Sequence, residues 1–195
     1  RFDEFYEMWM DFKIPFWMNT RCETMNPARA KKLEDMNMLR MSFGIEHGNE
    51  DYRKTILKRS TTNERMIEAF RMTADKKYVT NGNCIIGMPE ENRELIFDSI
   101  KFTRQLPKEI EKTGAFIFAP YHGTQLRDLA VKKGYIKNPN TICDITDPET
   151  SMLDQPNLRK NELIGLARTF GLYQTLPIDK WKFIKEAEDN TEQSK

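Results

Sequence analysis

The chain has 195 residues, with 31 Lys and Arg against 30 Asp and Glu, so its formal net charge is +1. This length fits one ordinary domain, and a content of 38% hydrophobic residues can form a buried core, which excludes general disorder. The near-zero charge supplies no field that would by itself hold nucleic acid or an acidic membrane, and no apolar run has the length of a bilayer-spanning helix.

The first half of the sequence alternates between apolar periods typical of helices and of strands. Asn26 followed by Pro27 is a typical helix start, because Asn caps the free N–H groups and Pro fits the first helical position. In chain order, the pattern predicts a helix at 2–10, a strand at 14–19, a helix from 27, a strand at 39–45, and helices at 50–57 and 62–77.

The second half continues the alternation and then changes character. The pattern predicts a buried strand at 82–89, a helix at 92–106, a strand at 115–119, a helix at 124–134, a long surface loop at 138–156, helices at 158–172 and 181–187, and a frayed end at 188–195. Buried strands that alternate with amphipathic helices indicate an α/β fold with about four parallel strands. Four such units are too few to close an eight-stranded barrel.

Candidate site residues follow the strands, because ligands of parallel α/β folds gather at the carboxyl ends of the strands. Glycine allows a ligand to approach the backbone closely, and it occurs here as Gly44 and Gly87. Glu46 can accept hydrogen bonds from ribose hydroxyls or an amine. Arg21 can pair with a ligand carboxylate, and Tyr121 can stack on a base.

Each of these residues also has a simpler structural interpretation. Glu46 could cap the following helix, although Asn49 competes for that role. Arg21 could form a surface ion pair with Glu23 or Glu50. An aromatic residue at a strand end, such as Tyr121, is more often part of the core.

The cysteines and histidines define no metal site by their spacing. Cys22, Cys84 and Cys143 are far apart in the sequence, so no pair has the spacing of a zinc finger or an iron–sulfur motif. We expect them to be small buried hydrophobic residues. Their odd number, without a secretory signal, favours a reducing, cytoplasmic location. His47 and His122 alone do not specify a metal ion.

The four strand ends resemble motifs of radical S-adenosylmethionine enzymes. The sequence at 42–48 followed by 56–59 resembles the fourth-strand region of that family, 85–91 its fifth-strand motif, 118–126 its sixth-strand turn, and 19–21 the end of its third strand. The subgroup with a cobalamin-binding domain ahead of the radical domain is the most similar. The resemblance covers residues 1–135, and it implies part of a (β/α)₆ barrel that holds S-adenosylmethionine.

The resemblance also implies roles for individual residues. Glu46 would contact the ribose or amino group of S-adenosylmethionine, and Arg21 and Arg59 its carboxylate. Ile86 and Gly87 would line the adenine, with Tyr121 nearby. The reaction of the family is reductive cleavage to a 5′-deoxyadenosyl radical that abstracts hydrogen from a small-molecule substrate.

One departure from the family pattern shapes the remaining expectations. The family binds a [4Fe–4S] cluster with three closely spaced cysteines, which are absent here. We therefore expect the cluster ligands, and any cobalamin domain, on a missing N-terminal portion of the same enzyme, without which this chain is inactive. Residues 1–135 would be the later part of the barrel and 136–195 a loop and helical extension; catalytic residues are left unassigned.

Two other readings remain open. A non-catalytic α/β module that binds a nucleotide or a partner protein would also lack the cluster cysteines. An aldolase-like barrel fragment would require a catalytic Lys on a strand end, and none of the four apolar strands carries one.

Overall fold

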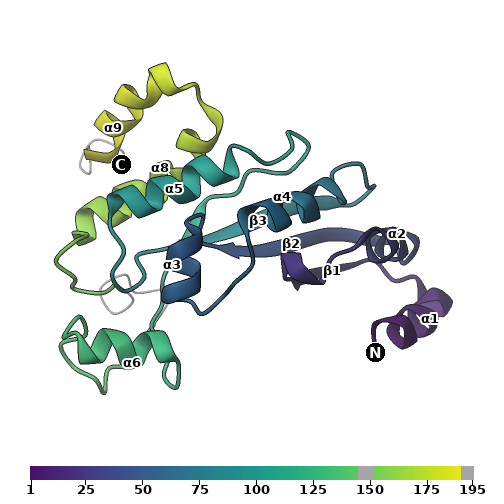
Figure 1. Ribbon diagram of the computed structural model, residues 1–195, viewed down its shortest axis with the longest axis horizontal. Coiled ribbons are helices and arrows are strands. Elements are labelled where there is room, and N and C mark those ends of the chain that lie inside the picture. The colour runs from purple at the N-terminus through teal and green to yellow at the C-terminus, as the bar shows by residue number, and fades with distance from the viewer. Residues whose placement is uncertain (145–151, 190–195) are drawn as a thin grey trace. The chain divides into compact units, whose positions relative to one another are not determined.

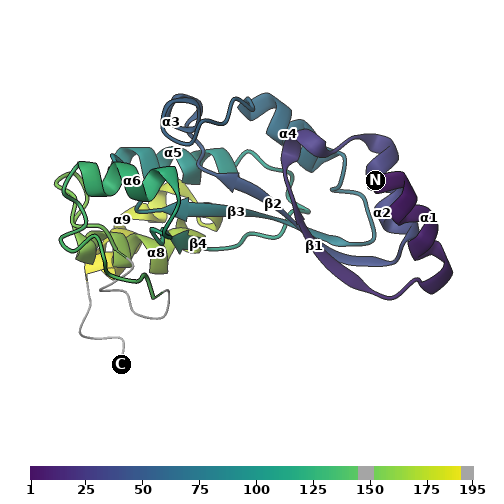
Figure 2. The ribbon, with the colours of Figure 1, turned by 90° about the horizontal axis from the view of Figure 1, so that it is seen from below.

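The computed structural model describes residues 1–144 and 152–189, and its strands form one open sheet in the order β1-β2-β3-β4 (Figures 1 and 2). The strands are β1 (Phe16–Thr20), β2 (Met38–Glu46), β3 (Val79–Ile86) and β4 (Ala115–Ile117). Pairing is parallel between β1 and β2 and between β3 and β4. The expected partial (β/α) barrel with about four parallel strands is therefore confirmed.

The helices begin close to where the sequence predicts. They are α1 (Phe2–Phe12), α2 (Pro27–Asp35), α3 (Glu50–Thr55), α4 (Asn63–Arg71), α5 (Arg93–Thr103), α6 (Gln125–Lys132), α8 (Lys160–Thr175) and α9 (Trp181–Asp189). Side chains that accept a backbone N–H at the start of a helix are Asn26, Asn49, Thr62, Asn92 and Thr124. Within the described residues, no helix is long and apolar enough to span a membrane.

The described chain divides into two compact units. The first contains residues 1–45, 61–83 and 105–113, and the second contains the described residues of 46–60, 84–104 and 114–195. In the first unit, the ring of Phe43 on β2 meets that of Phe70 on α4 edge to face, with centroids 4.9 Å apart. Gly82 on β3 has no side chain because a Cβ would collide with Phe70 and Ile45. This close contact packs α4 onto one face of the strands.

The second unit is built around α8, which lies beside both α5 and α9 (Figure 1). Rings of Phe97, Tyr173 and Trp181 form a mutual cluster with centroid separations of 5.0 to 5.4 Å. A second group of buried side chains surrounds the ends of β3 and β4; it contains Tyr52, Met88, Phe118, Ala130 and Leu153. These two clusters bury the apolar faces of the helices that the sequence predicts.

Two predicted surface segments are wrong in part. Glu188, expected at a frayed end, is only 3% exposed, and Arg93 donates two hydrogen bonds to its carboxylate. Leu153 and Gln155, expected in a surface loop, are buried as well. A polar residue is expected at the surface unless a distant residue forms hydrogen bonds with it in the interior, and local sequence does not reveal such a partner. The remainder of these predictions, at 145–151 and 190–195, lies outside the described residues.

Candidate functional site

Glu46, the last residue of β2, has an uncommon backbone conformation. Its φ of 64° is in the left-handed region, which is uncommon for a residue with a side chain and is found often at functional sites. Arg59 Nη1 donates to Glu46 Oε1 over 2.9 Å, and both side chains are partly exposed. Among the described residues, no donor contacts Oε2. One carboxylate oxygen is thus fixed and the other is available to a ligand.

The loop after β2 assigns the capping role to Asn49 rather than to Glu46. Asn49 Oδ1 accepts the Tyr52 N–H over 2.9 Å at the start of α3. The backbone N–H of Asn49 also donates to Nδ1 of His47, over 3.0 Å. His47 is completely buried and stacks on the Tyr52 ring with centroids 4.3 Å apart. The loop that carries Glu46 is consequently held from both sides.

The loop after β3 is held by hydrogen bonds to the carboxylate of Glu91, which belongs to the same loop. Gly87 has a φ of 83°, and the N–H groups of Gly87 and Met88 both donate to Glu91 Oε2. The Tyr52 hydroxyl donates to the Pro89 carbonyl over 2.7 Å. Because Glu91 is completely buried, these bonds replace the water that the carboxylate has lost. The Gly87 turn is therefore a fixed structure.

Burial controls the protonation of the groups around these loops. It raises the pKa of the Glu91 carboxyl, while the bonds from His47, Gly87 and Met88 act in the opposite direction. It also raises the pKa of the Cys84 thiol, and the charges of Glu46 and Glu91 add to that rise. Cys84 therefore remains a protonated thiol, which is unsuited to act as a nucleophile.

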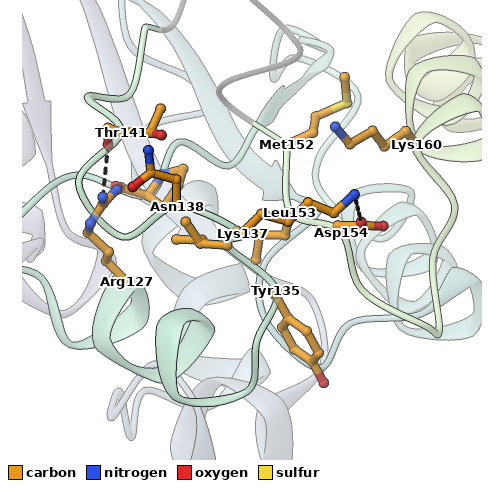
Figure 3. Close-up of a pocket in the computed structure, with 11 residues that line it drawn as sticks. Arg127, Tyr135, Lys137, Asn138, Thr141, Met152, Leu153, Asp154 and Lys160 are labelled. Atoms are coloured by element: carbon orange, nitrogen blue, oxygen red, sulfur yellow. Dashed lines mark hydrogen bonds and ion pairs between the residues drawn. The ribbon is translucent and has the colours of Figure 1, made fainter.

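A separate cavity of about 250 Å³ lies beyond β4 (Figure 3). Its basic groups are engaged: Arg127 donates to the carbonyls of Pro120 and Thr141, and Lys137 pairs with Asp154 over 2.8 Å. The full lining is Pro120, Arg127, Tyr135, Ile136, Lys137, Asn138, Thr141, Met152, Leu153, Asp154 and Lys160. None of the site residues predicted from the sequence lines this cavity.

The structure brings together only some of the predicted residues. Glu46 contacts Arg59, and Ile86 directly precedes the Gly87 turn. Tyr121 is 53% exposed, so it is not the core residue that its position suggested.

Two of the predicted residues, Gly44 and Arg21, belong to the first unit. Gly44 lies within β2. Arg21 forms an exposed ion pair with Glu23 at 3.7 Å, as the simpler interpretation proposed.

Sequence reasoning missed two polar groups. One is the pairing of His47 with Glu91, whose Nε2 and Oε1 atoms are 3.0 Å apart although 44 positions separate the residues. The other is a row in the first unit, in which Ser42 Oγ lies 2.8 Å from Asn81 Oδ1 and Asn81 Nδ2 lies 3.0 Å from Asn83 Oδ1. The spacing of Asn81 and Asn83 in a strand, two residues apart on one face, was the available signal.

The described residues contain no cluster of three or more His, Cys, Asp or Glu side chains that could hold a metal ion. These residues therefore do not fit a [4Fe–4S] cluster.

Comparison with protein families gives a match over just over half of the chain. The model of the Radical SAM superfamily matches residues 2–103. The uncharacterized methyltransferase PH0819 of Pyrococcus horikoshii is 28% identical over 127 residues, which are 65% of this chain and 27% of that protein. The chain thus spans about a quarter of the length of this curated relative.

Two solved enzymes have the same fold. The radical S-adenosylmethionine methyltransferase TsrM of Kitasatospora setae, with cobalamin and a [4Fe–4S] cluster bound, has a TM-score of 0.55 at 13% identity, covering 95% of this chain and 48% of that one. Coproporphyrinogen III oxidase (HemN) of Escherichia coli, a radical SAM enzyme, has a TM-score of 0.53 at 12% identity, covering 77% and 33%.

Proposed function

This chain belongs to the radical SAM superfamily, and we propose that it supplies the S-adenosylmethionine site of an enzyme in that class, at the ends of β2 and β3. Glu46 accepts hydrogen bonds from the ribose or amino group, and Arg59 orients the Glu46 carboxylate. The turn at Ile86 and Gly87 receives the adenine. The described residues offer no cluster ligands, so the [4Fe–4S] cluster that supplies the electron is bound by residues outside them.

The observation that carries this proposal is the left-handed backbone of Glu46. A strained backbone persists only where its surroundings determine it, and here a charge-assisted bond from Arg59 and the buried His47 loop do so. In this conformation, the Glu46 carboxylate, with one oxygen available, extends from the carboxyl end of β2. That is the position in which α/β folds bind ligands.

We further propose that the reaction transfers a methyl group with the help of cobalamin. This rests on relatives: the P. horikoshii protein is named a methyltransferase, and TsrM is a methyltransferase whose structure holds cobalamin. Both span much more sequence than this chain, so the residues that bind cobalamin and the substrate are expected outside it or in segments not yet assigned.

Titration with S-adenosylmethionine tests the site directly. The protein that carries this sequence, at its full encoded length and with its cluster reconstituted, should bind the ligand, and Glu46→Gln should weaken binding by about tenfold, as expected for a lost hydrogen bond to a charged group. Glu94→Gln on the exposed side of α5 is the matched control and should leave affinity unchanged. Equal affinity of the Glu46→Gln variant and the parent would refute the assigned role.

Iron and sulfide reconstitution tests the assignment of the cluster. These 195 residues alone should show no stoichiometric [4Fe–4S] absorbance. Tight binding of S-adenosylmethionine by these residues without a cluster would instead favour a non-catalytic binding module.

A further inference from the structure

We propose that His47 is a positioning residue for S-adenosylmethionine, which fixes the Gly87 turn after β3 to the Glu46 loop after β2 by holding the carboxylate of Glu91. The inference rests on the proposed function, because it assigns a role within that binding site. It concerns His47 and Glu91, which are both completely buried within the second unit.

The hydrogen-bond pattern determines which nitrogen of His47 carries the proton. The backbone N–H of Asn49 can only donate, so Nδ1 of His47, 3.0 Å away, must be the acceptor. The ring proton is therefore on Nε2, which lies 3.0 Å from Glu91 Oε1. His47 thus turns the nitrogen that carries its proton toward Glu91 Oε1. The contact is a close approach without hydrogen-bond alignment, and neither atom has another hydrogen-bond partner among the described residues. Arg53 Nη1 donates to the His47 carbonyl over 2.6 Å and helps to hold the residue in place.

Glu91 links this donor to the turn that is proposed to receive adenine. Its Oε1 faces His47, while its Oε2 accepts the N–H groups of Gly87 and Met88. The carboxylate is buried, so losing one donor leaves an oxygen without water to replace it. Without His47, we expect the Glu91 carboxylate to move, and the N–H groups of Gly87 and Met88 to move with it.

The pair of His47 and Glu91 joins the two parts of the proposed binding site. His47 directly follows Glu46, and the Glu91 carboxylate holds the backbone of Gly87. Tyr52 on α3 donates to the Pro89 carbonyl and so joins the same two loops. Gln155 Nε2 donates to the Met88 carbonyl over 3.0 Å and holds the turn from a third segment. The loops after β2 and β3 are thus held at several points, and His47 supplies the contact to the buried carboxylate of Glu91.

Two substitutions separate this role from that of a merely local turn residue. His47→Gln keeps a donor at the reach of Nε2 but removes the acceptor at Nδ1. His47→Asn keeps an acceptor at the position of Nδ1 but is too short to reach Glu91. A positioning role predicts that the Gln variant stays within about threefold of the parent affinity for S-adenosylmethionine, while the Asn variant loses about tenfold or more. A role confined to the Asn49 turn predicts the reverse order.

The experiment measures the Kd for S-adenosylmethionine at the full encoded length, with thermal unfolding of each variant as the folding control. Failure of the parent protein to bind would reject the proposed function itself. If the parent binds and the Asn variant binds equally well, or better than the Gln variant, the role of His47 is overturned.

A double-mutant cycle decides the case in which both variants lose affinity. Glu91→Gln and His47→Asn act on one contact, so their combined effect on Kd should be clearly less than the product of the single effects. Independent, multiplicative losses would overturn the proposal, and a shared loss would support it.

Discussion

Replacement of Arg93 by Ala is expected to loosen helix α9 from the second unit. Arg93 Nη1 and Nη2 donate to the two carboxylate oxygens of Glu188 over 2.7 and 2.8 Å. The Glu188 side chain is only 2% exposed, whereas that of Arg93 is 24% exposed. Tyr173 and Lys185 also donate to the carboxylate. Arg93 is therefore the main cation that balances a buried charge at the C-terminal end of α9.

The size of the effect follows from what remains after the substitution. Removing one member of a buried ion pair typically costs about 3–5 kcal/mol, because the other charge stays buried and unpaired. Tyr173 and Lys185 still bond to Glu188, so we expect a somewhat smaller loss, about 2–4 kcal/mol. Lys185→Ala removes a half-exposed donor and should cost about 0–1 kcal/mol, which makes it the matched control.

Hydrogen exchange measured by mass spectrometry on peptides of α9 and α8 is the direct assay, with urea unfolding for the global free energy. The Arg93→Ala variant should exchange faster in α9 than either the parent or Lys185→Ala. Adding Glu188→Gln should recover part of the loss, since it removes the buried charge. Unchanged exchange in α9, or an equal effect of Lys185→Ala, would refute the reasoning.

Three further outcomes are expected. Gly48→Ala would place a Cβ 2.5 Å from the backbone Cα of Ser99, so urea titration should show a free energy of unfolding lower by about 1–3 kcal/mol. Gly171→Ala in α8, where a Cβ would have open space, should be neutral or stabilising in the same titration. Phe70→Ala should cost about 3–5 kcal/mol by urea unfolding, because its ring is fully buried, and a smaller loss would mean that the core collapses around the gap. Burial raises the pKa of the Glu188 carboxyl, but its three donors have the larger, opposite effect, so the net pKa is below the usual 4.5. The stability that this group contributes is therefore complete above about pH 4.5 and is lost as the pH falls through the folded pKa. Urea titrations at stepped pH should show a weaker pH dependence in the Arg93→Ala variant.

Much of the architecture follows from local sequence. The caps at Asn26, Asn92 and Thr124 mark helix starts because their side chains satisfy N–H groups that no other part of the helix can reach. The apolar runs predict where the strands lie but not their burial, because Trp17 on β1 and Phe116 on β4 are exposed. Boundaries were less certain: β3 begins at Val79, before the apolar run, and β4 is only three residues long.

The candidate site was predictable only in part. Glu46 and Gly87 stand out locally as an acceptor and a glycine that directly follow predicted strands, although local sequence left a capping role open for Glu46. The partner of Glu46 was less evident: Arg59 is one of several nearby basic residues, and only the turn after α3 returns it to the end of β2. Arg21 had the same local character, and its exposed side chain pairs with Glu23 in this structure.

By itself, the sequence determined the parallel α/β class and the order of the elements, because short-range periodicity and capping specify these features. Only the tertiary structure decided that His47 meets Glu91 and that Glu188 is buried by Arg93. Those contacts join residues that lie 44 and 95 positions apart in the sequence. A buried charge is tolerated only where folding brings it a partner, and no local pattern encodes which distant residue that partner is.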